Sequence, residues 1–581
     1  MSTVPDQSLP LTDPADDPTA PSRPPMDAAV IVAGGGPVGM TLALDLAEAG
    51  IDVLVLEQSS GTTDNPRCNT TNARSMEYYR RLGIADDIRR VGLPLDHASD
   101  VVYTTNLLGW ELARFPFSSS GEILAGTAPE FDEWATPEPQ HRVSQIYLEP
   151  IIEEAVARQP RARVLRSHRV ESVSQHGDHV EVTARQVLPD GSTGEAVTFH
   201  ADYLAGCDGG TSVVRKAIGA RLEGDPRVAE QRVSVYFRSQ ELHELLAQRE
   251  PGWMYWWYGP KWRGSFVQLD GRGLFLCHSR VPAGMDPQDV DPDEVLEAAI
   301  GKLVEHEKIQ VVRWDPRRLV ADHFVEDRVM LAGDAAHLWL PLGGFGMNTG
   351  ISDAMGLSWR LSANVQGWGG RRLFEDYEAE RRSVGEATSR AALKIDSDMT
   401  EIGRDPELHA DTARGAELRS AAGELIERID KKQWYSQGVQ FGARYSNSRG
   451  IATDESTDRD GDAAIGEIDV YIPSITPGSR LPHYWRPDGS SVFDVLGPAW
   501  TLIRVGQEPP ACDRLVAAAQ GRGVPMSVVD LDEEDAVRTY KRAAVLTRPD
   551  LFVAWSGDSE PADPEALLDE LLGLGGTGDR A

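Results

Sequence analysis

Residues 28–58, AAVIVAGGGPVGMTLALDLAEAGIDVLVLEQ, constrain the fold of this chain more than any other stretch. The apolar run at 29–32 predicts a buried parallel strand. A helix is predicted over 40–49, with Gly50 as its C-terminal stop, and a second strand over 51–56. A strand–helix–strand unit of this kind is typical of a parallel sheet covered by helices, so the predicted fold class is α/β.

The turn after the first predicted strand carries three glycines in the spacing G-x-G-x-x-G. The first glycine permits a tight turn, the second lets a pyrophosphate approach the backbone, and the third lets helix and strand pack closely. The helix that follows would direct N–H groups at the phosphates, and Glu57 could accept hydrogen bonds from a ribose. The pattern predicts a dinucleotide site for FAD or NAD(H), since an acid disfavours a 2′-phosphate. Its predicted contacts are Gly34, Gly36, Pro37, Val38, Gly39, Glu57 and Gln58.

Composition narrows the class of protein. The 581 residues are 41% hydrophobic and 26% charged, as in soluble globular proteins. The net charge of −33 argues against nucleic acid or an anionic membrane as a partner. The four cysteines form no CxxC pair, so neither a disulfide scaffold nor a metal site is predicted. Residues 1–27 are rich in Pro and Asp and lack the apolar core of a signal peptide, which predicts a disordered tail and a cytoplasmic location.

Two later stretches also end a strand at a glycine and an acid. YLAGCDGGTSVVR covers residues 203–215, and RVMLAGDAAH covers residues 328–337. The second is followed by LPLGGFGMNTG at 340–350 and by a predicted long helix from about 351. With the first motif, these stretches resemble the single-component FAD-dependent aromatic hydroxylases, the family of 4-hydroxybenzoate and phenol hydroxylases. The resemblance extends from about residue 28 to 400 and more weakly to the C-terminus.

The resemblance implies a Rossmann-type FAD-binding domain, an inserted antiparallel β-sheet substrate domain and a C-terminal thioredoxin-like α/β domain. The C-terminal domain lacks the CxxC pair of a dithiol enzyme, because Cys512 stands alone. The implied boundaries are 28–205 and 206–230 for the first parts of the FAD-binding domain, 231–320 for the substrate domain, 321–400 for the last part of the FAD-binding domain, 401–467 for a helical connection and linker, and 468–581 for the thioredoxin-like domain.

The resemblance also implies contacts to FAD outside the first motif. Carboxylates suit sugar hydroxyls, and a glycine-rich loop at a helix start exposes N–H groups. Family positions near the pyrophosphate and ribityl chain are matched by Arg67, Gln145, Gly333 and Asp334, with Arg142 as a weaker candidate. Asp208 and Gly209 match a motif implicated in both FAD and NADPH binding, with Arg215 supporting the turn.

Residues 343–348 match the loop beside the isoalloxazine, and together with the preceding Pro341 and Leu342 we call them the flavin loop. The resemblance gives this loop the catalytic role, because its small residues leave room for O2 to form a flavin C4a-hydroperoxide. The residues concerned are Pro341, Gly343, Gly344 and Gly346, with Gly346, Met347 and Asn348 also as cofactor contacts. No catalytic base is assigned, although phenol hydroxylation needs a proton acceptor, and His337 is interpreted as structural.

The middle segment concentrates aromatic residues between positions 253 and 262. They could form a wall for a flat aromatic substrate. They could equally form the core of a sheet, since alternation along a strand divides them between two faces. The candidate substrate contacts are Tyr236, Trp256, Tyr258, Gln268 and His278. For each polar member, a structural hydrogen bond is the favoured interpretation.

The predicted function is an FAD-dependent monooxygenase that uses NADH or NADPH and O2 to hydroxylate a small phenolic or polycyclic aromatic, in secondary metabolism or aromatic degradation. A homodimer is one option for its assembly. The first alternative is a Baeyer–Villiger-type or other flavin oxidoreductase on the same fold. The second is a non-catalytic flavin-bearing protein that binds a ligand. A flavin halogenase is disfavoured, because WMYWWYGP does not match the halogenase motif WxWxIP.

Overall fold

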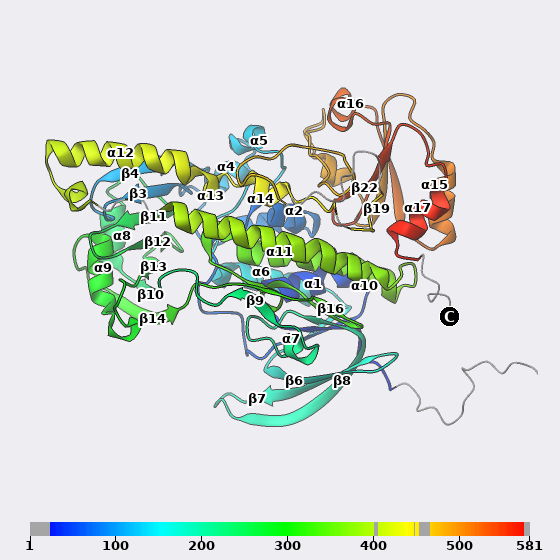
Figure 1. The fold of residues 1–581 in the computed structure, drawn as a ribbon, viewed down its shortest axis with the longest axis horizontal. Helices are drawn as coiled ribbons and strands as arrows, with labels where there is room; N and C mark the ends of the chain where they lie inside the picture. Colours follow the sequence, from blue (N-terminus) through cyan, green and yellow to red (C-terminus); the bar gives the residue numbers. More distant parts are fainter. Residues whose placement is uncertain (1–23, 400–401, 403–404, 447, 453–464, 575–581) are drawn as a thin grey trace, which may run out of the picture.

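The computed structural model describes residues 24–399, 402, 405–446, 448–452 and 465–574 (Figure 1). Most of the predicted N-terminal tail therefore lies outside the described residues, as do 453–464 of the predicted linker. The last residues of that tail are held in place, since the Asp27 N–H donates to the His200 carbonyl at 2.9 Å.

An eight-stranded sheet forms the centre of the part that the sequence predicts to bind FAD. Strands β16, β17, β8, β1, β2 and β5 follow one another in that order, and β6 and β7 continue from β8 as an antiparallel extension. β1 pairs in parallel with β2, as the opening motif predicts, and also with β8. The bounds are β1 (Ala28–Ala33), β2 (Val53–Leu56), β5 (Ala162–Leu165), β6 (His168–Gln175), β7 (Val180–Val187), β8 (Thr193–Gly206), β16 (Val325–Glu326) and β17 (Val329–Leu331).

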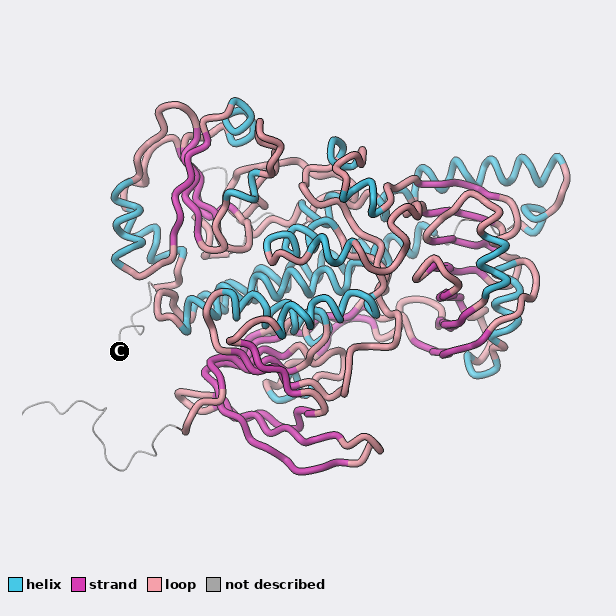
Figure 2. The backbone as a smooth tube through the Cα atoms, turned by 180° about the vertical axis from the view of Figure 1, so that it is seen from behind, coloured by secondary structure: helices cyan, strands magenta, loops and turns pink. Residues whose placement is uncertain are grey.

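Long helices cover this sheet, and Figure 2 shows them from behind above its strands. α1 packs against α6 and α10, and α10 packs against α11. The apolar side chains of α1 and α10 join those of β1 and β2 in one buried core. The bounds are α1 (Pro37–Glu48), α2 (Ala73–Arg81), α3 (Ala85–Arg89), α4 (Ser120–Leu124), α5 (Glu130–Glu133), α6 (Gln145–Ala157), α7 (Val213–Ala217), α10 (Phe345–Val365) and α11 (Arg372–Met399).

A seven-stranded sheet with the order β14-β10-β13-β12-β11-β3-β4 forms the part that the sequence predicts to bind the substrate, and we call it the substrate sheet. Helices α8 and α9 cover one face, where their apolar side chains join those of the strands. Helices α12 and α13 supply side chains to the core on the other face. The bounds are β3 (Val101–Thr104), β4 (Glu111–Phe115), β10 (Arg232–Arg238), β11 (Met254–Tyr258), β12 (Arg263–Gln268), β13 (Leu274–Arg280), β14 (Glu307–Trp314), α8 (Gln240–Leu246), α9 (Pro292–Ile300), α12 (Ala413–Ile429), α13 (Lys431–Trp434) and α14 (Gln437–Phe441).

Two strands of this sheet come from outside the segment 231–320 that the sequence assigned to it. β3 pairs in parallel with β11, and β4 pairs with β3. They satisfy the edge of β11, which would otherwise expose unpaired backbone groups. A third, small sheet of β18 (His337–Leu338), β15 (Arg318–Ala321) and β9 (Leu222–Asp225) links the two larger parts.

The C-terminal domain has the thioredoxin-like arrangement, so the predicted fold class is confirmed. Its sheet has the order β20-β19-β21-β22, in which β19 and β20 are parallel and the other pairs antiparallel. Helices alternate with the first strands and close the domain. The bounds are β19 (Trp500–Val505), α15 (Asp513–Gly521), β20 (Met526–Leu531), α16 (Glu534–Tyr540), β21 (Ala544–Thr547), β22 (Val553–Gly557) and α17 (Pro564–Leu571).

A buried network of charges attaches this domain to α10 and α11. Arg548 donates to both oxygens of Glu380 on α11, at 2.7 and 3.0 Å. Glu380 also accepts from Arg360 on α10 at 2.7 Å, and Arg548 pairs with Asp550 at 2.6 Å. All four side chains are 2% exposed or less. Figure 1 shows α11 running from the substrate sheet towards this domain, so the network fixes the domain to the helices that carry the site.

Candidate active site

The glycine turn after β1 has the shape that its spacing predicts. Gly34 has a φ of +106°, and a Cβ there would lie 2.3 Å from the Cys207 carbonyl oxygen. A Cβ on Gly39 would lie 2.0 Å from the Gly34 carbonyl oxygen. Around Gly36, by contrast, no atom lies within 4 Å of the Cβ position. The first and third glycines are therefore needed for packing, and the second leaves open space beside the backbone.

Glu57 lies at the end of β2 beside this turn. Its carboxylate accepts from the Gly35 N–H at 2.6 Å and from the Ser59 N–H at 2.7 Å. The two bonds fix the carboxylate at the carboxyl end of the parallel strands, where ligands bind in open α/β sheets. Pro37 occupies the first turn of α1, and Gln58 is exposed.

The Asp208 turn is held from both sides. The Asp208 carboxylate accepts from the Ser212 hydroxyl and from the N–H of Val213 at 2.7 Å, so it caps α7. Arg215 donates to the carbonyls of Gly210 at 2.8 Å and Ala335 at 2.9 Å. Arg215 thus supports the turn, as expected, and also ties it to the Gly333–Asp334 motif. The cap formed by Asp208 was not anticipated from the sequence.

Asp334 carries a carboxylate that is ready to accept a hydrogen bond. Its side chain is exposed, and among the described residues no group donates to it. Desolvation by the surrounding protein raises its pKa, against the opposing effect of His337 and Arg67. Arg67 is itself exposed. An accessible carboxylate in partly desolvated surroundings is a suitable acceptor for a hydroxyl group of a ligand.

The flavin loop is shaped by two glycines and one asparagine. Gly343 and Gly344 have φ values of +65° and +66°, and a Cβ on Gly344 would lie 3.0 Å from the Thr70 Cβ. The Asn348 amide donates to the carbonyls of Thr70 at 2.9 Å and Gly344 at 2.5 Å, and it accepts from the Asn72 N–H at 2.9 Å. Asn348 therefore fixes the loop to the segment before α2 through both the nitrogen and the oxygen of its side-chain amide.

The other predicted loop residues surround this anchor. Pro341 is exposed, and Gly346 and Met347 are half-buried at the start of α10. Val38 lies where Cβ atoms on Gly333 and Gly350 would approach it to 3.1 and 2.6 Å. Val38, just after the glycine turn, therefore lies close to both the Gly333–Asp334 motif and the start of α10.

Gln145 and Arg142 lie at the start of α6 and just before it. Gln145 is half-buried and donates to Glu149 at 2.6 Å. Arg142 is 3% exposed and donates to the Thr70 hydroxyl at 3.1 Å, but its Nε and Nη2 atoms have no partner among the described residues. Its guanidinium lies over the rings of Phe117, Trp253 and Trp434. Burial lowers the pKa of Arg142 to about 9, which leaves it positively charged at neutral pH.

His337 belongs to a structural network, in agreement with its sequence interpretation. Its Nε2 atom lies 2.7 Å from Asp353, which also accepts from Arg381 at 2.7 Å. Burial opposes ionisation of Asp353, but Arg381 and His337 hold its pKa at about 2. Its carboxylate also accepts from the Gly333 N–H at 3.0 Å, which places the network directly behind the Gly333–Asp334 motif.

The register of the seven-stranded sheet divides the aromatic cluster between its two faces. Trp256 lies opposite Ser265, which lies opposite His278. Tyr236, Trp256, Tyr258 and His278 share this face, because side chains alternate along each strand. Tyr255 and Trp257 belong to the core beneath α8 and α9.

Only part of the predicted substrate set meets the flavin loop. Trp256 packs against the buried cluster that contains Phe345 of the loop, and Leu342 of the loop packs against the same cluster. Gln268 donates to the Gly252 carbonyl at 2.6 Å. His278 lies 2.7 Å from the Ser234 hydroxyl, and burial lowers the pKa of His278 to about 4. The structure thus gives Gln268 and His278 the structural bonds that the sequence favoured for them.

Two residues on the same face, Tyr103 and Asp430, were not predicted from the sequence. The Tyr103 hydroxyl donates to Asp430 and accepts from the Trp434 indole N–H at 2.8 Å. Burial raises the pKa of Asp430 to about 7. Asp430 lies between α12 and α13, in a segment interpreted from sequence only as a helical connection, and no motif marks it.

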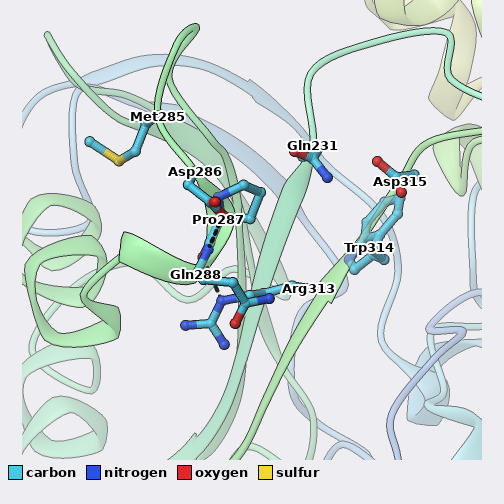
Figure 3. A pocket seen from close by; sticks show the side chains of 8 residues that line it. All are labelled: Gln231, Met285, Asp286, Pro287, Gln288, Arg313, Trp314 and Asp315. Carbon is cyan, nitrogen blue, oxygen red and sulfur yellow. Dashed lines mark hydrogen bonds between the residues drawn. The ribbon is translucent and has the colours of Figure 1, made fainter.

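An open depression of about 520 Å³ lies elsewhere on the substrate sheet. Figure 3 shows its lining, which comes from Gln231, Arg313, Trp314, Asp315 and the segment 285–288. None of the predicted site residues takes part in this lining. In the described part of the chain, no three His, Cys, Asp or Glu side chains are grouped so that they could hold a metal ion.

The geometry fits an FAD cradle, and the comparisons with known proteins agree. The FAD binding domain family matches residues 27–392, and the family of aromatic-ring hydroxylase C-terminal domains matches residues 474–574. The chain belongs to the FAD-dependent aromatic-ring hydroxylases. This hydroxylase is therefore a flavoprotein monooxygenase with FAD as its cofactor, which decides between the two ligands that the glycine motif had left open.

Relatives of the hydroxylase match it over nearly the whole chain. Aklavinone 12-hydroxylase RdmE of Streptomyces purpurascens is 31% identical over 571 residues, which are 94% of this chain and 98% of the relative. FAD-dependent monooxygenase apdD of Emericella nidulans is 30% identical and covers 92% and 88% of the two chains.

Solved structures match the fold of the hydroxylase equally well. The rebeccamycin biosynthetic enzyme RebC with reduced flavin has a TM-score of 0.83 at 34% identity, covering 95% of this chain and 100% of the other. Aklavinone-11 hydroxylase with FAD and aklavinone has a TM-score of 0.76 at 27% identity, with the same coverage. Among the described helices, none is long and apolar enough to cross a membrane.

Proposed function

We propose that this enzyme uses NAD(P)H and O2 to hydroxylate a phenolic or polycyclic aromatic substrate. The observation that carries the proposal is the packing of Trp256, on the aromatic face of the substrate sheet, against the buried cluster that contains Phe345 of the flavin loop. This packing brings an apolar, aromatic surface to the loop that accompanies the cofactor. Such a surface suits a flat aromatic ring.

The residues present fit FAD along its whole length. Gly36 offers the pyrophosphate open space beside the start of α1. Glu57 would accept from the ribose, and Asp334 from the ribityl chain. Arg67, Gln145, Gly209 and the N–H groups of the flavin loop complete the proposed contacts. FAD, when bound and reduced by NAD(P)H, would activate O2, which supplies the oxygen atom that the reaction inserts.

The chain's own residues prepare the space around the reacting ring. Asn348 keeps the flavin loop in one conformation, because its amide makes three hydrogen bonds. Arg142 holds a positive charge beside Thr70, where the loop is anchored, and it forms no ion pair with the described residues. A buried cation there would stabilise negative charge that develops nearby, since the site is poorly solvated. Trp256 and the neighbouring core side chains exclude water.

The proposed substrate class follows the aromatic face and the relatives. Two of the relatives are named for the hydroxylation of aklavinone, and others are called polyketide hydroxylases or phenol 2-monooxygenase. A polycyclic polyketide aromatic with a free phenol is therefore the class to be tested first.

We infer a cytoplasmic location, because the four cysteines remain free thiols.

The test uses the purified full-length chain. The protein should be yellow, should release FAD on denaturation, and should oxidise NAD(P)H with O2 faster when a hydroxyanthraquinone is added. The product should gain one oxygen atom on its ring. A colourless protein that cannot be loaded with FAD contradicts the proposal. NAD(P)H oxidation that no aromatic accelerates would favour a non-catalytic flavin-bearing protein, and oxygen inserted into a ring C–C bond would indicate Baeyer–Villiger chemistry.

A further inference from the structure

Two tryptophans from distant parts of the chain lie at the same side of the flavin loop. Trp256 belongs to β11 of the substrate sheet, and Trp339 follows β18, just before the loop. Both side chains are half-buried, and both pack against one buried cluster. The members of this cluster come from the loop, from α11 and from the segment after the linker, and they are Phe345, Ala392, Ile395, Met399 and Ile468. The two indoles therefore border one region between the substrate sheet, the flavin loop and α11.

The indole N–H groups of Trp256 and Trp339 are buried and have no hydrogen-bond partner among the described residues. An indole N–H can only donate a hydrogen bond, and a buried tryptophan usually has an acceptor for it. A donor that has left water without finding an acceptor costs free energy. The two N–H groups are therefore suited to an acceptor that enters with a ligand.

Trp339 is held in place by its ring, which leaves its N–H group free. The ring stacks on His337, with the ring centroids 4.5 Å apart and an interplanar angle of 15°. A Cβ on Gly346 of the flavin loop would lie 4.0 Å from the Trp339 Nε1 atom. Apart from the loop's own stretch of chain, no other heavy atom lies within 4 Å of that Cβ position. The N–H group of Trp339 consequently borders open space beside the flavin loop.

An unpartnered indole does not by itself indicate a ligand. Trp257 and Trp500 also have unpartnered N–H groups, but both of these side chains are fully buried. Trp257 lies in the core beneath α8 and α9, and Trp500 lies in the core that includes the C-terminal domain. Trp256 and Trp339 differ from them because they are half-buried and border the flavin loop from two sides.

We propose that Trp256 and Trp339 donate hydrogen bonds to carbonyl oxygens of the substrate, which makes the substrate a polycyclic quinone or aryl ketone. A ring carbonyl only accepts hydrogen bonds, so it complements two groups that only donate. The apolar surfaces of the indoles can pack against the ring system that carries the carbonyl. A phenol without a carbonyl would leave both donors unpaired, and a site built for a hydrogen bond discriminates strongly against a ligand that lacks it. The inference rests on the proposed function and adds the carbonyl as the group that is recognised.

The first experiment measures binding without turnover. The compounds 2-hydroxyfluorenone and 2-hydroxyfluorene are both phenols and differ only in one ring carbonyl. Each is added to the FAD-loaded enzyme without NAD(P)H, and the change in flavin absorption gives the dissociation constant. The wild type should bind the ketone at least about tenfold more tightly. Trp339→Phe and Trp256→Phe keep an aromatic ring but lose the N–H group, so each should weaken binding of the ketone and leave binding of hydroxyfluorene unchanged.

Trp257→Phe is the matched control, because it removes an unpartnered indole N–H from the same strand but from the opposite face. This variant should keep the preference for the ketone. Equal affinity of the wild type for the two compounds, or an unchanged preference in both site variants, overturns the proposal. A Trp339→Phe variant with altered FAD affinity and an unchanged preference assigns this indole to the cofactor and overturns it as well. If one site variant does not fold, the other gives the answer.

The second experiment measures NAD(P)H oxidation with quinizarin, a dihydroxyanthraquinone that carries two ring carbonyls. Trp339→Phe should raise the KM for quinizarin about tenfold with little change in kcat, because the bond to the carbonyl forms on binding. Trp257→Phe should keep the KM of the wild type. If the two fluorene compounds accelerate NAD(P)H oxidation with equal kcat/KM, the inference fails and the proposed function stands. If no phenol accelerates it, the proposed function itself fails, so the two failures are distinguishable.

Discussion

The side-chain amide of Asn348 donates to the Thr70 carbonyl at 2.9 Å, and this bond joins residues that are 278 positions apart. It fastens the flavin loop to the segment that precedes α2. Because the same amide also bonds Gly344 and Asn72, it determines where the loop lies before any cofactor enters.

Asn348→Ala should therefore loosen the loop and weaken FAD binding. We expect the dissociation constant of FAD to rise about tenfold, equivalent to the loss of one or two net hydrogen bonds. Flavin fluorescence titration of the apoprotein measures it. Asn364→Ala is the control, since Asn364 lies near the other end of α10 and donates to the Arg360 carbonyl at 3.0 Å. Equal FAD affinity in the two variants would contradict the anchoring role.

Gly36→Ala should fold normally and lose FAD. The Cβ position at Gly36 is free of protein atoms within 4 Å, so the chain itself tolerates a methyl group. The methyl group would occupy the space proposed for the pyrophosphate. Thermal unfolding of the apoprotein and the ratio of bound FAD to protein report the two effects. Gly177→Ala is the control, because Gly177 lies in a hairpin loop where the Cβ position is equally free of protein atoms, and this variant should keep its FAD. If Gly36→Ala also keeps its FAD, the pyrophosphate does not bind beside Gly36.

Asp334→Ala should lower FAD retention during gel filtration. The Asp334 carboxylate has no partner among the described residues, so its removal breaks no bond of the fold. Asp327→Ala serves for comparison, because Asp327 lies on the preceding turn and pairs with Arg371 at the surface. Unchanged flavin content in Asp334→Ala would rule out the ribityl contact.

Glu380→Gln should destabilise the whole chain by roughly 3 kcal/mol, because it leaves Arg360 and Arg548 buried without their shared carboxylate. Urea unfolding followed by tryptophan fluorescence measures the change. Asp530→Asn is the control, because it removes an exposed ion pair with Arg504. Its free energy of unfolding should fall by only about 0–1 kcal/mol. A similar small effect in Glu380→Gln would show that the network does not hold the C-terminal domain in place.

Asp430 should make stability depend on pH. Its pKa is raised from 3.8 to about 7 in the folded chain, so folding favours the protonated form. This contribution is fully present below about pH 4 and is lost as the pH rises through 7. Asp430→Asn should therefore gain stability relative to the wild type between about pH 5 and pH 8. The urea concentration at the midpoint of unfolding, measured for both proteins at about pH 5 and about pH 8, tests this prediction. The same difference between the two proteins at both pH values would contradict it.

Local constraints were predictable from the sequence. Gly34 and Gly39 are required by contacts within one strand–turn–helix unit, so their spacing alone indicates their roles. The alternation along β11 likewise predicted that Trp256 and Trp257 lie on opposite faces.

Relationships between distant segments were not predictable. Tyr103 and Asp430 are 327 positions apart, and neither belongs to a motif. The position of β3 beside β11 depends on pairing between residues 153 positions apart, such as Val101 and Met254, which no local pattern encodes. Asp208 was assigned to cofactor binding, and only the structure reveals that its carboxylate caps α7. A sequence motif does not reveal whether such a side chain stabilises the fold, contacts a ligand or does both.

The most direct test of the central claim is the fate of isotopically labelled O2 during turnover with quinizarin and NAD(P)H. The account predicts one labelled oxygen atom on the aromatic ring of the product for each NAD(P)H oxidised, with full dependence on bound FAD. A product that carries unlabelled oxygen, or NAD(P)H oxidation that yields only hydrogen peroxide with every phenol supplied, would contradict it.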